Sequence, residues 1–126
     1  MKKEIFACCL ILALFAGALV NIHCINNLTG EMIALVQQAS QYAENEQWQL
    51  AEQSALQAEK LWSSKDAYTH IVMPHSEIET AADTFYEFMK EIYSQNAGGV
   101  KGAAKAVTAH LQDIADRENL SFGSIF

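Results

Sequence analysis

A helical repeat of apolar side chains between residues 68 and 92 narrows the possible folds of this chain more than any other feature. The apolar positions recur at alternating steps of three and four residues, which returns them to one face of an α-helix with its turn of about 3.6 residues. Charged residues such as Asp83, Glu87 and Glu91 fall on the other side, where water solvates them. The apolar row consists of Tyr68, Ile71, His75, Ile78, Ala82, Phe85, Met89 and Ile92. We therefore expect an amphipathic helix here, with its apolar face in a protein core.

Three further segments show the same helical spacing, over residues 28–42, 48–62 and 100–114. Turn-forming residues interrupt the pattern at Asn45-Glu46 and again from Gln95 to Gly99. Strand-type alternation of useful length occurs nowhere in the sequence. The chain is therefore predicted to be all-α.

The N-terminus carries a long apolar stretch that follows Lys2 and Lys3. The stretch is unbroken from Ile5 to Val20, and apolar side chains continue up to Ile25. A helix needs about 20 apolar residues to cross a bilayer, and residues 5–25 provide that length. Because basic residues stay on the cytoplasmic side, we expect the rest of the chain to cross the membrane.

A cleaved signal peptide is the alternative interpretation, with Ala16-Gly17-Ala18 as a small-residue cleavage site. We favour an uncleaved anchor because the apolar stretch continues past this site from Leu19 to Ile22. The predicted organisation is an N-terminal transmembrane or signal-anchor helix at residues 1–25 and a small antiparallel bundle of three to four helices at residues 26–126. The bundle would be extracytoplasmic, held at the cell membrane by a single pass, or secreted if the first segment is cleaved.

The predicted bundle is strongly acidic. From residue 26 onward the chain holds six Lys/Arg and fourteen Asp/Glu, a formal net charge of −8. Such a surface repels phosphate backbones, so we expect no nucleic-acid binding. The three cysteines, Cys8, Cys9 and Cys24, form no metal-binding or disulfide motif.

Several short motifs occur in an order that resembles a known protein family. After the basic start and the apolar stretch come Trp48 with Ala51-Glu52, Lys60-Leu61-Trp62, His75-Ser76-Glu77-Ile78 and Glu118-Asn119-Leu120-Ser121. The chain is similar over nearly its whole length to domain-of-unknown-function family 4363, whose members are small, bacterial and membrane-anchored. The resemblance implies a membrane location and a helical fold, and it implies no activity.

His75 is a titratable ring in the otherwise apolar row and the sharpest candidate for a binding site. Glu79 lies one turn further on, so a histidine–carboxylate pair on one edge of the helix is sterically possible. If the helices that carry them pack antiparallel, His110 can approach this pair and complete a partial zinc shell. A core histidine bonded to Glu79 or to a carbonyl is the more common arrangement, and a pH-responsive histidine is the third alternative.

Two further expectations concern the neighbours of His75. Pro74 removes a backbone donor, and because the apolar row keeps its phase across it, we expect a kink and not a break in the helix. Glu77 falls on the solvent side of the helix, about 200° away from Glu79, so these two carboxylates cannot share a reacting atom.

No nucleophile motif or phosphate-binding loop is present in the sequence, so we expect neither enzymatic activity nor a cofactor. Trp48 and Trp62 lie fourteen residues apart on one predicted helix face. Core packing is their more common role, but aromatic side chains also anchor partners at interfaces. A bundle this small has a limited core, so another membrane protein or a second copy of the chain can supply further burial. We predict a non-enzymatic interaction or accessory module, with a metal- or pH-responsive sensor that uses the histidines as the alternative.

Overall fold

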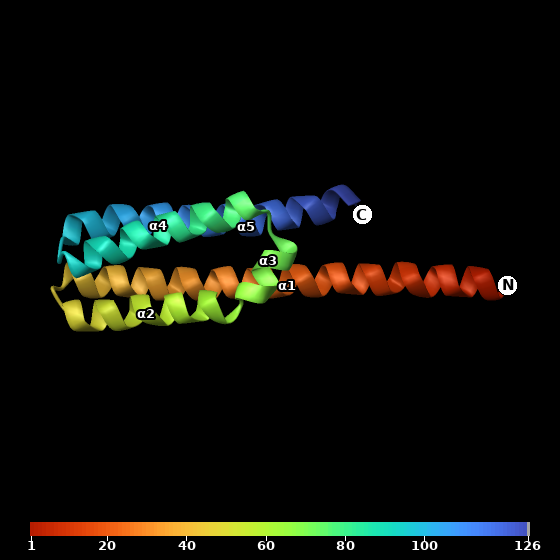
Figure 1. Cartoon of the computed structure of the whole chain (residues 1–126), viewed down its shortest axis with the longest axis horizontal. Helices are drawn as coiled ribbons and strands as arrows, with labels where there is room; N and C mark the ends of the chain where they lie inside the picture. Colours follow the sequence, from red (N-terminus) through yellow and green to blue (C-terminus); the bar gives the residue numbers. More distant parts are fainter. Residues whose placement is uncertain (126) are drawn as a thin grey trace.

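The computed structural model describes residues 1–125, apart from the side chains of Val72 and of residues 121–125. Within that range the chain forms five α-helices and no strand, which confirms the predicted all-α fold. The four long helices lie roughly along one direction, and α1 extends well beyond the others toward the N-terminus (Figure 1). The helices are α1 Lys2–Glu44, α2 Trp48–Ser64, α3 Asp66–Val72, α4 His75–Tyr93 and α5 Ala97–Ile125.

The bundle is an antiparallel arrangement around α1. Both α2 and α5 pack along α1, and α4 packs against α5, whereas α2 and α4 contact each other only lightly. The short α3 crosses from the end of α2 to the start of α4, at the end of the bundle that faces the N-terminal half of α1 (Figure 1). One side of the bundle, between α2 and α4, is therefore less tightly closed than the others.

α1 is one uninterrupted helix of 43 residues whose two halves have different surroundings. Its N-terminal half contains a segment long and apolar enough to cross a membrane, with none of that segment buried; signal sequences share these properties. From Ile25 onward one side of the same helix is buried in the bundle, at positions such as Leu28, Met32 and Val36. The predicted boundary between residues 25 and 26 thus lies inside a continuous helix.

The two turns at the far end of the bundle are built in the same way. Glu46 after α1 and Gln95 after α4 both adopt a left-handed backbone, with φ of 59° and 55°. In each turn the next residue donates its N–H to a carbonyl five positions earlier, a Schellman arrangement that satisfies the helix end. These bonds join Gln47 to Tyr42 at 2.8 Å and Asn96 to Glu91 at 3.1 Å. Each turn holds a left-handed residue other than glycine, which costs about 1–2 kcal/mol.

The prediction of a kink at Pro74 was wrong, because the helix breaks there. Met73 and Pro74 have extended backbones, with ψ of 145° and 146°, so α3 ends at Val72 and α4 begins at His75. The proline ring clashes with a helical conformation of the residue before it, and the missing N–H removes a helix bond. The apolar row changes direction at the break, and Ile71 on its N-terminal side is exposed.

The buried side chains form two clusters. The larger cluster joins α1, α2, α4 and α5, and Phe88 of α4 is its largest fully buried side chain. Alanines at the buried positions of α2 allow this helix to lie close to α1. The smaller cluster, at the end where α3 crosses, consists of Ile25, Met73, Ile78 and Ile114. The core therefore continues from the middle of the bundle to the C-terminal end of the exposed apolar segment.

Candidate functional site

His75 and Glu79 lie together on the surface of α4. The His75 Nε2 atom is 3.0 Å from a Glu79 carboxylate oxygen, and the two side chains are 77% and 66% exposed. The histidine–carboxylate pair that their spacing makes possible is present, but the expected core position of His75 was wrong. The break at Pro74 explains the difference, because it starts α4 at His75 and lets this first residue face solvent.

His110 does not join this pair. It lies on α5, with its Nε2 atom 3.3 Å from the backbone oxygen of Glu77 and 3.7 Å from the Glu77 carboxylate. Among the residues that the structure describes, no group of three or more His, Cys, Asp or Glu side chains is arranged to hold a metal ion. The partial zinc shell of His75, Glu79 and His110 is therefore not formed.

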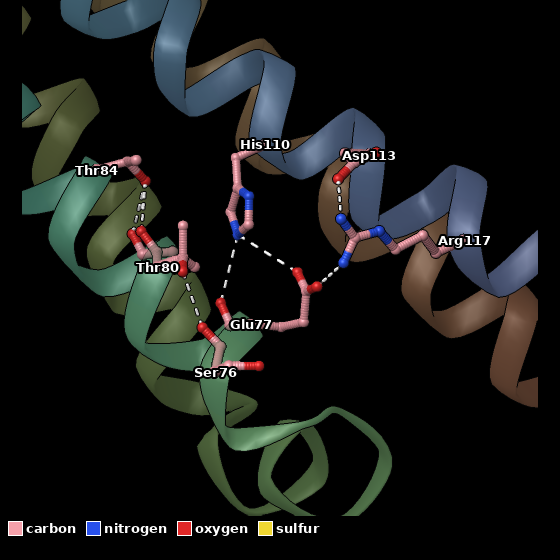
Figure 2. A network of polar contacts seen from close by, with 8 residues as sticks. Ser76, Glu77, Thr80, Thr84, His110, Asp113 and Arg117 are labelled. Carbon is pink, nitrogen blue, oxygen red and sulfur yellow. Dashed lines mark hydrogen bonds and ion pairs between the residues drawn. The ribbon is translucent and has the colours of Figure 1, made fainter.

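Glu77 instead lies at the centre of a polar cluster between α4 and α5 (Figure 2). Its side chain is only 15% exposed and forms an ion pair with Arg117. The Arg117 guanidinium also lies 2.9 Å from Asp113, one turn away on α5. The expected solvent-side position of Glu77 was wrong, since α5 covers it. The i,i+4 spacing of Asp113 and Arg117 was visible in the sequence, whereas the partner on α4 depends on how the two helices align.

A second polar contact connects the end of the apolar segment to the bundle. The Tyr68 hydroxyl on α3 donates to the side-chain oxygen of Asn21 on α1. The Asn21 amide in turn donates to Glu118 of α5, at 3.4 Å. Burial raises the pKa of the Tyr68 hydroxyl, and the negative charges of Cys24 and Glu118 raise it further. Three helices therefore meet at one asparagine.

A groove of about 650 Å³ opens between α2 and α4, on the side where these helices touch only lightly. Its apolar lining comes from all four long helices: Met32 of α1, Trp62 of α2, Phe85 and Met89 of α4, and Leu111 of α5. This volume falls within the range of about 300–1,000 Å³ typical of ligand sites.

Two aromatic side chains stand at the mouth of the groove. Tyr86 and Tyr93 lie seven residues apart on α4, line the groove and are 70% and 57% exposed. Exposed tyrosines beside an apolar surface are common at protein interfaces, because the ring packs and the hydroxyl stays hydrated. Sequence reasoning did not single out this pair, although the seven-residue spacing was a usable signal.

The two tryptophans occupy different positions. Both are partly buried and pack against the larger cluster of core residues. Trp62 also packs against the smaller cluster and lines the groove, whereas Trp48 is not part of the groove lining. Of the two predicted interface candidates, Trp62 therefore lies beside the groove and Trp48 does not line it.

The model of a protein family described as a domain of unknown function, DUF4363, matches residues 19–125. The chain belongs to this family. The DUF4363 match begins inside the apolar stretch and continues to the end of α5, so it includes Asn21 and every helix that lines the groove. No curated protein and no solved structure matches the chain significantly.

Proposed function

We propose that this DUF4363 protein is a membrane-anchored, non-enzymatic interaction module whose bundle stands on the outer side of the cell membrane. The continuity of α1 supports this proposal most directly. Its exposed apolar segment and the central helix of the bundle are one helix. The membrane anchor and the core helix around which the bundle packs are then the same element.

The exposed apolar side chains supply the driving force for membrane insertion. Ile5, Phe6, Leu12 and Leu14 are all well exposed, and no other part of the described chain covers them. Moving apolar surface out of water is favourable by about 25 cal/mol per Å², so this segment is far more stable in lipid than in water. Lys2 and Lys3 before the segment favour a cytoplasmic N-terminus, which directs the acidic bundle outward.

The partner in this proposal is a second protein in the same membrane. A bundle held close to the bilayer meets membrane proteins at a high effective concentration, so modest affinity is enough for complex formation. The open side between α2 and α4 offers a contact surface, because α2 and α4 touch each other only lightly there and the lining residues Trp62 and Phe85 are only partly buried.

Extraction of the full-length protein from isolated membranes at alkaline pH tests the anchor. We expect the chain to stay in the membrane pellet with residues 1–20 still present. A protease added on the outer side of the membrane should digest the bundle. Replacing Leu12 and Leu14 by arginine should release the protein, since each charge at the centre of a span costs about 2.5–3.5 kcal/mol. The matched control replaces Leu50 and Leu56, both 40% exposed on α2, by arginine and should leave the protein in the pellet.

Two results would contradict the proposed anchor. Release of the unmodified protein into the supernatant would show that α1 is not embedded in lipid. A mature chain that begins near Leu19 would identify the segment as a cleaved signal peptide, and the bundle as a secreted protein.

A further inference from the structure

The groove between α2 and α4 has the length of a short helix. Along α4 its lining extends from Ala81 to Tyr93, which at 1.5 Å per residue is about 18 Å, or roughly three turns of helix. The lining residues Ala82, Phe85, Met89 and Tyr93 recur at steps of three and four, so they form one continuous wall. Trp62 stands opposite on α2, and Met32 and Leu111 contribute from the remaining helices. The groove is thus an apolar trough elongated along α4, and α2 lines it over about one turn, from Glu59 to Ser63.

The edges of this trough carry more negative than positive charge. Glu59 of α2 and Lys90 of α4 both line it. Glu52 precedes Glu59 by seven residues, and Glu79 precedes Tyr86 by seven, so helical spacing places these two carboxylates on the same sides of α2 and α4, beyond the residues that line the groove. Three carboxylates therefore accompany one ammonium group along these two sides, within a domain that is acidic as a whole.

We infer that this groove binds an amphipathic α-helix of a partner protein, about three turns long, with Lys or Arg along its edges. The inference rests on the proposed role as an interaction module and specifies the chemistry of the partner. Apolar side chains at positions i, i+3 or i+4, and i+7 of the partner would contact Trp62, Phe85 and Tyr93, which line the groove and keep exposed surface. Its basic edges would lie beside Glu59 and Glu79, and the negative field of the domain would accelerate the encounter.

The same features disfavour two other occupants. An acyl chain has no polar edge, so it would gain nothing from the carboxylates beside the groove. A second copy of this chain would bring an equally acidic surface to the groove, and like charges at an interface repel.

The test uses the full-length protein in lipid nanodiscs and labelled synthetic peptides. The main probe is a helical peptide of about four turns with leucines at i, i+3, i+4 and i+7 and lysines along both edges. One matched peptide replaces each lysine by glutamate, and another keeps the composition but scrambles the order. Fluorescence anisotropy measures affinity, and a photo-cross-linking amino acid in place of Tyr86 identifies the contact site. The same residue in place of Gln112, exposed on α5, is the control for position.

Two pairs of variants distinguish binding in the groove from binding elsewhere on the surface. Ala82→Trp fills the trough, whereas Ala106→Trp adds the same ring to an exposed position on α5 outside it. Glu59→Lys reverses a charge that lines the groove, and Glu87→Lys makes the same reversal at an exposed position of α4 outside the lining. All four positions are exposed or at the surface, so the fold is expected to remain.

We expect saturable binding of the basic peptide, cross-linking from Tyr86 and not from Gln112, and clearly weaker binding of both matched peptides. Ala82→Trp should weaken binding by about tenfold, which is the effect of losing one well-packed interface contact. Ala106→Trp should leave the affinity unchanged. Glu59→Lys should weaken binding about fivefold more than Glu87→Lys. Glu59 would lie close to the bound peptide, whereas Glu87 contributes only to the overall negative charge of the domain.

Several results would overturn the inference. The inference is wrong if the basic peptide shows no saturable binding, or if the acidic or the scrambled peptide binds as tightly as the basic one. It is also wrong if the two variants of either pair change the affinity equally. Stoichiometric displacement of the peptide by oleate would identify an acyl-chain site, and cross-links from Tyr86 to a second copy would identify a homodimer interface. Membrane extraction is measured separately, so an anchored chain that binds no peptide would contradict this inference and leave the anchor intact.

Discussion

Replacing Arg117 is expected to destabilise the protein more than replacing Glu77, although the two side chains form one ion pair. Glu77 is 15% exposed, whereas Arg117 and Asp113 are 59% and 50% exposed. Arg117→Gln removes the counter-charge of a mostly buried carboxylate, one oxygen of which already has no hydrogen-bond partner. Glu77→Gln leaves the guanidinium beside Asp113 and in contact with water. Because Glu77 is much more buried than Arg117, the two substitutions are expected to lower the free energy of unfolding by different amounts.

The magnitudes follow from the surroundings of each charge. Loss of one partner of a fully buried pair costs about 3–5 kcal/mol, and loss of a hydrogen bond to a charged group about 1.5–3 kcal/mol. Because Glu77 keeps some exposure and has His110 nearby, we expect about 2–3 kcal/mol for Arg117→Gln. For Glu77→Gln, which keeps the shape of the side chain, we expect about 1 kcal/mol.

Urea unfolding of the full-length protein in detergent, followed by tryptophan fluorescence, measures both free energies. The double variant gives the coupling energy of the pair, which we expect to be about 1–2 kcal/mol. Glu79→Gln serves as the control, because its pair with His75 is exposed and such pairs contribute little. Equal costs for Arg117→Gln and Glu77→Gln, or a larger cost for Glu77→Gln, would refute the argument from burial.

Three further predictions address the core, the turns and the alkaline stability of the protein. Phe88 is fully buried, so Phe88→Ala should lower the free energy of unfolding by about 3–5 kcal/mol, and a loss below about 1 kcal/mol would contradict its position in the core. Glu46→Gly and Gln95→Gly should each stabilise the protein by about 0.5–1 kcal/mol in urea unfolding, since glycine adopts the left-handed conformation without strain; a loss of stability in both would argue against these turns. The pKa of Tyr68 is raised by folding, so its neutral form is favoured in the native state, and its contribution is fully present below the ordinary value of 10.0 and is lost as the pH rises above it. Stability measured from about pH 9 to pH 11 should therefore fall less steeply in Tyr68→Phe than in the unmodified protein, and identical slopes would exclude this role.

The helices and their turns were predictable because their signals are local. Three–four spacing identifies a helix from its own residues, and it located the helical segments on both sides of the turns that follow α1 and α4. The second turn is shorter than the expected range from Gln95 to Gly99, because α5 already begins at Ala97. The sequence analysis set a boundary between residues 25 and 26, whereas α1 continues across it as one helix. The break at Pro74 was missed because the phase of the apolar row received more weight than the clash between proline and the preceding residue.

The polar cluster and the groove were not predictable, because they depend on the distances between helices. Glu77 looks like a solvent residue on its own helix and becomes buried only when α5 lies across it. The groove exists because α2 and α4 pack on other helices and not on each other, which no spacing within either helix reveals. His75 shows the opposite error, since an apolar row drawn across a helix break assigned it a core position that it does not have.

The continuity of α1 also has a mechanical consequence. From Asn21 to Glu44 the helix rises about 35 Å, without a loop or hinge between the apolar segment and the far end of the bundle. If α1 spans a bilayer as proposed, a tilt of about 20°, common for such helices, displaces the far turns sideways by about 12 Å. Met32, which lines the groove, belongs to α1, so the groove moves when the anchor tilts. Because a helix tilts more in a thinner bilayer, membrane thickness would be converted into the direction in which the groove faces.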